Sequence, residues 1–404
     1  MIPALASPLL GEHEDRRPPL DPFISVIVPV RNEAGHIEKT LHQILHQHYD
    51  AKRFEVIVVD GQSTDGTWAI VSNLQKAHDN LLVLTNPQRW SSAGRNTGIR
   101  AARGDIVVII DGHCDLDNED YLIHLAHAFE RSAADCVGRP QPLDVSGANL
   151  LQRAIALARS SRLGHHPDSF IYSDVESYVP PQSVAVAYRR EVFERVGLFD
   201  ESFDACEDVE FNHRVARAGL RCFFTPRVQV RYFPRENWNG LLRQMLRYGR
   251  GRMRLLVKHR DTASLGCMVP AFLVGGLALG PIALLSPWLL VAYTIGLAMY
   301  SLVVVGFSLV LTWQAKDLRL FPWLTLVFLT VHVGAGLGLL QELIQGVWKI
   351  GRENSRKRSR VLLRPSNQPS QILAWRHTQT SDVSETSEVS PLDQHRELPR
   401  NLAG

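Results

Sequence analysis

The sequence predicts an α/β fold with a Rossmann-like, mainly parallel sheet, helices on both faces of the sheet, and C-terminal transmembrane helices. Three observations lead to this prediction. Apolar runs alternate with amphipathic helical segments up to about residue 135, several of these runs end in an acidic residue, and charged residues nearly vanish after residue 265. Strands that alternate with helices imply crossover connections and a parallel sheet, whose ligand site lies at the carboxyl ends of the strands.

The first third of the chain supplies the regular elements. The run FISVIVPV at 23 to 30 is rich in β-branched residues and predicts a strand, and Ile37, Leu41 and Ile44 then fall on one helical face. The alternation continues with strands at 54 to 60, 81 to 84 and 105 to 111, and with helices at 67 to 77, 91 to 102 and 119 to 131.

Beyond about residue 135 the predicted elements become less regular. We expect a helix near 148 to 162, a loop rich in Gly, His, Pro and Asp at 164 to 181, and a short strand at 183 to 188. Loop-rich segments over a rigid sheet are common places for substrate recognition, so we expect a second substrate to bind to this half.

Three apolar segments predict about three membrane helices, at 267 to 285, 288 to 312 and 321 to 344. The first two contain no Asp, Glu, Lys or Arg and are long enough to cross a hydrocarbon core of about 30 Å. The third ends in Gln341 and Glu342 and is a weaker span.

Basic segments lie on both sides of this apolar region, at about 243 to 260 and 349 to 364. The positive-inside rule places both in the cytoplasm, which two spans satisfy and three spans do not. The third apolar segment is therefore either a tolerated third span or a re-entrant or interfacial helix.

Composition limits the functional classes. A net charge of +3 on 404 residues gives no reason to expect a nucleic-acid partner. The five cysteines form no CxxC pair, which argues against a zinc knuckle and fits a reducing compartment. The first twenty residues do not resemble a cleaved secretory signal, so we expect the α/β domain to face the cytoplasm.

The expected segments are a disordered N-terminus at 1 to 20, the α/β domain at 21 to 235, a basic juxtamembrane amphipathic segment at 236 to 262, a transmembrane region at 265 to 346, and a basic and then disordered tail at 350 to 404.

Asp60 closes the run FEVIVVD before the turn GQSTDGT. At the carboxyl end of a strand, its carboxylate can accept hydrogen bonds from a nucleobase or from ribose hydroxyls. The alternative is an acid that caps the following helix, a role for which Asp65 is the better candidate.

Arg95 and Asn96 begin a helix of small residues in WSSAGRNTGIRAARGD. A helix N-terminus with a guanidinium beside it suits phosphate oxygens. The alternative is a surface arginine on an amphipathic helix.

Asp111 and His113 surround Gly112 at the end of the run DIVVIID. Residues i and i+2 of an extended segment point to the same side, so both side chains can face one cation. A divalent ion there would contact a diphosphate and neutralise the charge that builds on it, and the imidazole ligand favours Mn²⁺ slightly over Mg²⁺. The alternative is a buried hinge acid beside an exposed histidine.

Glu207 and Asp208 precede the helix-like segment VEFNHRVARAG. We expect Asp208 to deprotonate an acceptor hydroxyl and Glu207 to orient that hydroxyl. Paired acids at a helix start also stabilise the helix macrodipole, which is the structural alternative.

Gln244, Arg247 and Tyr248 are spaced as QxxRY in the basic segment that leads to the apolar region. The alternative for most of the arginines there is an amphipathic helix on anionic lipid, with the arginine stems snorkelling.

Together, these motifs resemble those of the inverting glycosyltransferases of family 2, and within that family the membrane-attached exopolysaccharide enzymes of the succinoglycan-synthesis type. The similarity covers about residues 23 to 250, through SVIVPVRNE, VVDGQSTDGT, AGRNTGIRAARGD, IIDGH, and RREVFERVGLFDESF with EDVEFNHRV. It implies a nucleotide-binding GT-A fold.

The resemblance also implies roles for individual residues, with two departures from the family pattern. DGH replaces the usual DxD, which weakens the expected metal site, and Tyr248 replaces the Trp of the QxxRW element of processive relatives, so we expect single-sugar transfer. The implied roles are donor binding by Pro29, Arg31, Glu33, Asp60, Arg95, Asn96 and Asp111; metal binding by Asp111 and His113; catalysis by Asp208 with Glu207; and an acceptor or product channel at Gln244, Arg247 and Tyr248.

The expected function is inverting transfer of a sugar from a nucleoside-diphosphate donor, a UDP-sugar by expectation, with Mn²⁺ or Mg²⁺ as cofactor. The expected acceptor is a lipid-linked, polyprenyl-type glycan or a polysaccharide, in exopolysaccharide or cell-surface glycan synthesis. The protein would be a multi-pass protein of the inner or plasma membrane with a cytoplasmic catalytic domain. One alternative is a non-catalytic membrane scaffold that binds a nucleotide sugar; another is a nucleotidyltransferase, which the lack of a glycine-rich pyrophosphorylase loop disfavours.

Overall fold

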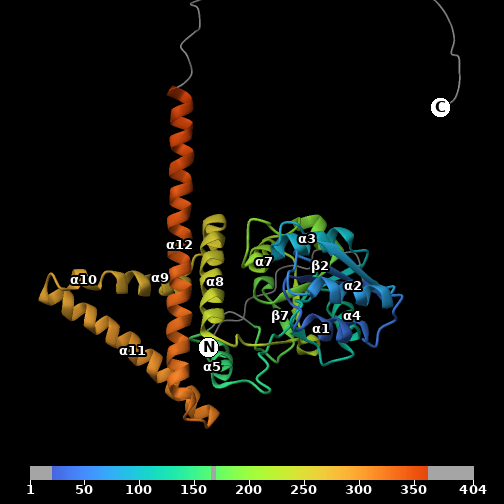
Figure 1. The fold of residues 1–404 in the computed structure, drawn as a ribbon, viewed down its shortest axis with the longest axis horizontal. Helices are drawn as coiled ribbons and strands as arrows, with labels where there is room; N and C mark the ends of the chain where they lie inside the picture. Colours follow the sequence, from blue (N-terminus) through green and yellow to red (C-terminus); the bar gives the residue numbers. More distant parts are fainter. Residues whose placement is uncertain (1–20, 165–169, 363–404) are drawn as a thin grey trace, which may run out of the picture. The chain divides into compact units, whose positions relative to one another are not determined.

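A computed structural model describes residues 21–164 and 170–362 of the chain (Figure 1). The segment 1–20, residues 165–169 of the predicted loop, and the tail from residue 363 lie outside the described residues. The disorder expected at the two ends therefore stays a prediction.

An eight-stranded sheet forms the centre of the α/β domain, in the order β3-β2-β1-β4-β8-β6-β9-β7. Strand β1 pairs in parallel with β2 and β4, and β2 pairs in parallel with β3. Strand β8 then lies antiparallel between β4 and β6. The mainly parallel sheet is thus confirmed, and the predicted strands lie within about two residues of the observed ones. The strands are β1 (Ile24–Val30), β2 (Phe54–Asp60), β3 (Leu81–Thr85), β4 (Ile106–Ile109), β6 (Cys136–Gly138), β7 (Ser177–Val179), β8 (Ala185–Arg189) and β9 (Cys222–Phe224).

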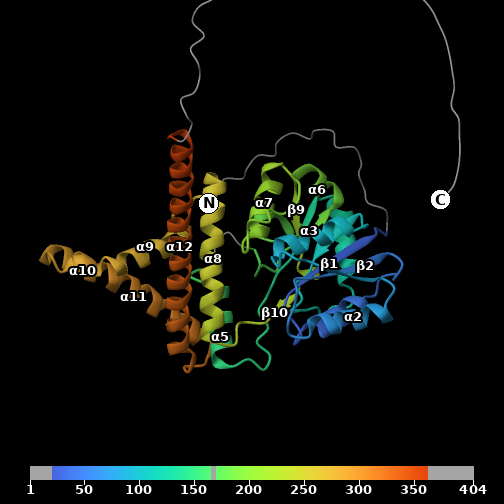
Figure 2. The same cartoon turned by 45° about the horizontal axis from the view of Figure 1, so that its top comes forward.

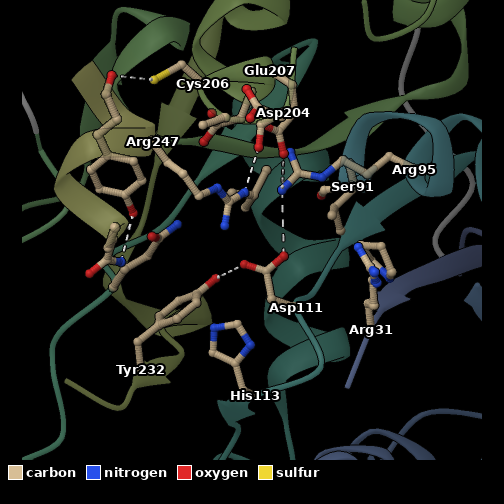
Figure 3. Close-up of a pocket in the computed structure, with 18 of the residues that line it drawn as sticks. Arg31, Ser91, Arg95, Asp111, His113, Asp204, Cys206, Glu207, Tyr232 and Arg247 are labelled. Carbon is tan, nitrogen blue, oxygen red and sulfur yellow. Dashed lines mark hydrogen bonds and ion pairs between the residues drawn. The ribbon is translucent and has the colours of Figure 1, made fainter. Parts of the chain in front are cut away.

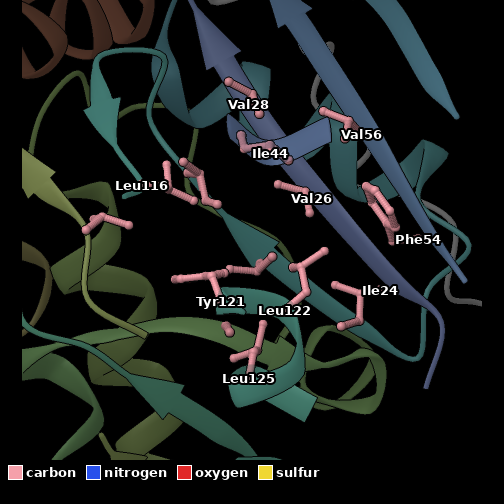
Figure 4. Close-up of a cluster of buried hydrophobic side chains, with 14 of the residues drawn as sticks. Ile24, Val26, Val28, Ile44, Phe54, Val56, Leu116, Tyr121, Leu122 and Leu125 are labelled. Atoms are coloured by element: carbon pink, nitrogen blue, oxygen red, sulfur yellow. The ribbon is translucent and has the colours of Figure 1, made fainter. Parts of the chain in front are cut away.

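Helices cover both faces of the sheet, as Figure 2 shows for α2 on one side and α3, α6 and α7 on the other. Along β1, Val26 and Val28 point into the first layer, with α1, α2 and α4, whereas Ile27 points into the second, with α3, α6 and α7 (Figure 4). Burial on both faces explains why these strands read as continuous apolar runs. The helices are α1 (Ile37–Leu45), α2 (Thr67–Ala77), α3 (Ser91–Ala101), α4 (Tyr121–Ser132), α6 (Arg190–Val196) and α7 (Glu207–Arg217).

A small antiparallel sheet lies next to the end of β4. It joins β5 (Cys114–Asp115) to β10 (Arg231–Tyr232), with Tyr232 opposite Cys114. This pairing brings a segment more than a hundred residues away to the DGH motif.

Two long helices stand beside the α/β domain, α8 (Trp238–Lys258) and α12 (Leu320–Leu362). They pack closely, because a Cβ atom on Gly338 of α12 would overlap the carbonyl of Leu246 on α8. Helix α5 (Leu150–Ser160) contributes to the same apolar cluster. Residues 351–404 form a separate unit, of which the structure describes only the end of α12.

The apolar region differs from the three spans expected. In place of a helix at 267 to 285 the structure has α9 (Leu265–Ala278) and the short α10 (Gly280–Ala283), because Gly280 and Pro281 interrupt the segment. The 14 residues of α9 rise about 21 Å, which is short of a hydrocarbon core of about 30 Å. Among the described residues, two helical segments are long and apolar enough to cross a membrane: α11 (Pro287–Ala315) and Leu320–Gly346 of α12.

Candidate active site

A cavity of about 730 Å³ opens at the carboxyl ends of β1, β2 and β4, where Val30, Val59 and Ile109 line it. This is the edge at which open α/β sheets bind ligands. The cavity brings together most of the predicted site residues: Pro29, Arg31, Glu33, Arg95, Asp111, His113, Glu207, Asp208, Gln244, Arg247 and Tyr248. Asp60 and Asn96 do not line it.

Arg95 connects the predicted metal ligand to the predicted catalytic pair. Its Nη2 lies 3.6 Å from Oδ1 of Asp111 and 3.4 Å from Oε1 of Glu207 (Figure 3). Helix α3 supplies this guanidinium, the end of β4 supplies Asp111, and α7 supplies Glu207. The surface-arginine alternative for Arg95 is therefore wrong.

Asp111 is held as a carboxylate at the cavity wall. Burial alone would raise its pKa, but Arg95, His113 and the hydroxyl of Tyr232 outweigh burial and hold the pKa below the ordinary value. The Tyr232 hydroxyl donates to Oδ2 of Asp111 at 2.9 Å. No sequence signal marked Tyr232, because only the β5–β10 pairing places it there.

His113 lines the cavity beside Asp111 and contacts Glu33. The Nδ1 of His113 lies 3.1 Å from Oε1 of Glu33. Burial would lower the pKa of His113, but the hydrogen bond to Glu33 and the charges of Glu33 and Asp111 raise it overall. An Nδ1–H that donates to Glu33 leaves Nε2 with its lone pair, and a carboxylate in this position is typical of metal-binding histidines. The carboxylate and imidazole set thus fits a divalent cation such as Mn²⁺.

Glu207 and Asp208 begin helix α7 and differ in environment. Glu207 is buried, and burial raises its pKa even though Arg95 acts in the opposite direction. Asp208 is exposed in the cavity wall and accepts a hydrogen bond from the backbone N–H of Val209 at 2.8 Å. Asp208 is therefore the more accessible of the two carboxylates.

Helix α8 forms the opposite wall through one of its faces. The amide of Gln244 donates to the hydroxyl of Tyr248 at 3.2 Å, and Nη2 of Arg247 donates to the carbonyl of Asp204 at 2.6 Å. Figure 3 shows Arg247 and Arg95 reaching the same part of the cavity. The alternative of arginines resting on lipid does not describe Arg247, because its guanidinium reaches the cavity wall and donates to Asp204 there.

Asp204, three residues before Glu207, was not predicted and anchors the loop before α7. Its Oδ1 accepts from Nη1 of Arg254 at 2.5 Å, and Arg254 also pairs with both carboxylate oxygens of Glu342 on α12, at 2.8 and 3.0 Å. The loop that carries the acid pair is thereby connected to α8 and α12. Sequence spacing gives no indication of a contact between residues 204 and 342.

Asn96 has a structural position, which corrects its predicted role in donor binding. Its amide nitrogen donates to the carbonyl of Phe199 and to Glu201, and its carbonyl oxygen accepts from the N–H of Phe199, all at 2.9 Å. These bonds fix the loop before α7. Asn96 also lies within α3, which begins at Ser91, and not at the helix start that the sequence suggested. A polar residue in a helix looks the same in sequence whether it faces a ligand or a loop.

Asp60 lies beside the cavity, between the lining residues Val59 and Gly61. Its Oδ2 accepts from the N–H of Ser63 at 3.1 Å, and its buried Oδ1 has no hydrogen-bond partner in the described structure. Asp65 takes the local role at the start of α2 by accepting from Thr67. The predicted nucleobase contact of Asp60 stays a prediction.

Positive charge dominates the cavity wall, which contains eight arginines and five carboxylates. Arg139, also missed from sequence, is 1% exposed and donates to the carbonyl of Ile109 at 3.2 Å. Its Nε has no hydrogen-bond partner. Such a cavity suits a ligand with several negative charges, such as a diphosphate.

The chain is similar in sequence to known glycosyltransferases. A model of the family described as glycosyl transferase family 2 matches residues 25–197. The succinoglycan biosynthesis protein ExoA of Rhizobium meliloti is 29% identical over 323 residues, which is 79% of this chain and 94% of that protein. The glycosyltransferase AglE of Haloferax volcanii is 30% identical over 244 residues, 59% of this chain and 76% of that protein.

A solved structure supports the fold. The mannosyltransferase PcManGT of Pyrobaculum calidifontis, solved in complex with GDP-Man and Mn²⁺, superposes with a TM-score of 0.51 at 23% identity. The superposition covers 82% of this chain and 90% of that one.

Proposed function

The chain belongs to glycosyl transferase family 2, and we propose that this glycosyltransferase moves a sugar, with inversion, from a nucleoside-diphosphate donor to a hydroxyl of a lipid-linked or polysaccharide acceptor. One observation carries this proposal. Asp111, Arg95 and Glu207 form a connected series of charges in a single cavity that Asp208 also lines. A diphosphate position and a proton acceptor therefore lie on the same side of the sheet.

In the proposed reaction, Asp208 takes the proton of the acceptor hydroxyl while that oxygen attacks the anomeric carbon. The bond from this carbon to the diphosphate breaks on the opposite face, and the transition state has oxocarbenium character, as in other glycosyl transfers. Arg95 lies where it can meet the negative charge that moves onto the diphosphate. Glu207 holds Arg95 in place through their ion pair.

A divalent cation at Asp111 and His113 would neutralise part of the charge on the departing nucleoside diphosphate. The ionised state of Asp111 and the contact between His113 and Glu33 support these two residues as its ligands. The complex of PcManGT with Mn²⁺ supports the same class of ion. The choice between UDP-sugar, our expectation, and another nucleotide sugar stays a prediction.

We further propose that the protein acts at the cytoplasmic face of a cell membrane, in exopolysaccharide or cell-surface glycan synthesis. The similarity to a succinoglycan biosynthesis protein supports this setting. The exposed apolar helix α11 would keep the catalytic domain beside a lipid-linked acceptor.

The test is sugar transfer and donor hydrolysis by the detergent-purified protein, with a panel of nucleotide sugars and with or without Mn²⁺. Asp208→Asn should bind the donor normally, measured by thermal shift, and should slow transfer by roughly 10²–10⁴-fold, the usual contribution of a positioned base. The control is Asp79→Asn, the same change at a surface carboxylate, which should leave transfer unchanged. Glu210→Gln would be a poor control because Glu210 is buried. Near-full turnover by Asp208→Asn would exclude Asp208 as the base. A wild-type protein that binds donor but neither transfers nor hydrolyses it would favour the scaffold alternative.

A further inference from the structure

A second group of possible metal ligands lies outside the cavity, on α7 and just after α8. It consists of His213 in α7, His259 directly after α8, and Asp261 in a short 3₁₀ turn (Arg260–Thr262). One ring nitrogen of each histidine and one oxygen of Asp261 lie within 4.8 Å of one another. Over residues 21–164 and 170–346, no other group of three His, Cys, Asp or Glu residues comes this close.

The contact between His213 and Asp261 is not an ordinary hydrogen bond. Nε2 of His213 lies 3.2 Å from Oδ2 of Asp261, yet this buried nitrogen has no hydrogen-bond partner. The separation is close to the roughly 3.3 Å between two ligand atoms of a tetrahedral Zn²⁺ site with bonds of about 2.0 Å. A cation between the two atoms would satisfy both lone pairs.

His259 is oriented by a buried carboxylate. Its Nε2 lies 3.0 Å from Oε1 of Glu210, and Glu210 is 0% exposed. Lys258 and Arg214 also pair with Glu210, at 2.7 and 3.0 Å. A Nε2–H that donates to Glu210 leaves the lone pair on Nδ1, the orientation that carboxylates impose on metal-binding histidines.

We propose that His213, His259 and Asp261 bind a Zn²⁺ ion whose fourth ligand is water. Two imidazoles and one carboxylate are a ligand set that zinc accepts in tetrahedral geometry. Asp261 is exposed, so the ion has a path from solvent. The ion would fasten α7, which begins with the acid pair, to the end of α8, which carries Arg247, and would thus hold two walls of the cavity together.

The experiment measures metal binding by the full-length, detergent-purified protein, with a tag that contains no histidine and after removal of metal by chelator. We expect one Zn²⁺ per chain by elemental analysis, a higher melting temperature on zinc addition, and the strong visible absorption of tetrahedral Co²⁺ when Co²⁺ is the probe. His213→Gln and Asp261→Asn should each weaken zinc binding at least tenfold and remove most of the thermal shift. Asp261 is exposed, so Asp261→Asn should fold even if His213→Gln does not.

Two controls separate this site from other histidines and from the catalytic cation. The rings of His42 and His46 stack at 3.8 Å and form a surface pair that could bind zinc adventitiously. His46→Gln removes one of these rings and should still bind one equivalent of zinc. Asp111→Asn should abolish Mn²⁺-dependent transfer and keep the zinc. Zinc bound with unchanged affinity by both His213→Gln and Asp261→Asn, or lost in His46→Gln alone, would overturn the proposal without bearing on the transferase function.

Discussion

Arg95 is the residue on which the geometry of the cavity depends. It is the common partner of Asp111 and Glu207, and its ring neighbour Phe199, 5.4 Å away, belongs to the loop that Asn96 fixes. The guanidinium of Arg95 attracts each of these carboxylates only while that carboxylate is ionised, so protonation of one breaks its pair with Arg95. The protonation of Glu207 should therefore be visible in the reaction.

We expect Glu207 to set the acid limb of the pH profile. Its pKa is raised by burial, so as pH falls this carboxyl takes up a proton at a higher pH than an ordinary glutamate, and the pair with Arg95 is lost. Transfer should fall through that range in the wild type. Glu207→Gln should be slower at neutral pH and should lack this limb when kcat/KM is measured from pH 4.5 to 8. An unchanged limb in the variant would assign the titration to another group.

Asn96 should matter for stability and not for donor binding. Asn96→Ala removes three hydrogen bonds and leaves the groups of Phe199 unpaired, which should cost about 1–3 kcal/mol of unfolding free energy. The donor KM, measured well below the melting temperature, should stay within about twofold of wild type. Thr97→Ala, next in the same helix, is the matched control. A stable Asn96→Ala protein with a tenfold higher KM would restore the donor-binding role.

The residues that sequence could identify belong to the regular elements or follow them directly. Asp111 follows the end of β4, and Arg95 lies within α3, the helix that follows β3; strand ends and the helices after them meet at one edge of a parallel sheet. Tyr232, Arg139 and Asp204 reach the cavity through long-range pairing and side-chain length, which periodicity does not encode. Asn96 shows the reverse error, since a polar residue in a helix can face a loop as well as a ligand.

At the scale of elements, α8 is the connection between the catalytic domain and the apolar helices. Its Arg247 and Arg254 both hold Asp204, and Arg254 extends the contact to Glu342 on α12. The close approach at Gly338 keeps α8 and α12 in register. The position of α12 should therefore affect the catalytic loop. The predicted basic segment at 236 to 262 contains a helix, α8, and the sequence could not show which of its faces the arginines use.

Glu342→Gln should lower kcat while leaving the donor KM nearly unchanged. The substitution removes the charge that holds Arg254, so the loop from Asp204 to Glu207 loses one of its fixed supports, and small displacements of catalytic groups are costly. We expect a decrease of roughly tenfold in kcat, with partial recovery in Glu342→Asp. Gln341→Ala, on the exposed side of the same turn, should have no effect. Full activity of Glu342→Gln would mean that α8 positions the loop alone.

At the scale of the whole molecule, α11 and α12 differ in what covers them. Only 11% of the most apolar part of α11 is buried, against 50% for α12, whose covered face packs on α8 and α5. If α12 crossed the bilayer, α8 and its arginines would be drawn toward hydrocarbon, at a cost of about 2.5–3.5 kcal/mol for each charge. Periodicity could not show this, because a buried core helix and a membrane helix are equally apolar.

The ends of the α9–α11 region both lie at the catalytic domain. Helix α9 packs on α8 through Ala271 and Met253, and Asp317, just after α11, pairs with Arg153 of α5 at 3.0 Å. The turn between α10 and α11 and the first residues of α11 are strongly exposed, with Leu285 in the turn at 81% and Trp288 at the start of α11 at 83%. We therefore expect α9 to α11 to enter the membrane as a hairpin, which leaves both basic segments in the cytoplasm, as the positive-inside rule requires.

Cysteine labelling from either side of the membrane tests the hairpin. In a variant whose five native cysteines are replaced by alanine, single cysteines at Arg319 and Gly346 mark the two ends of the apolar part of α12. Both should react with a membrane-impermeant maleimide only in inside-out vesicles, because α12 stays beside the cytoplasmic domain. Leu285→Cys, at the tip of the hairpin, should be protected from the maleimide in intact inside-out vesicles. Asp79→Cys on the catalytic domain serves as the cytoplasmic control. Labelling of residues 319 and 346 from opposite sides would establish that α12 spans the bilayer, and the packing of α8 on α12 would then have to open in the membrane.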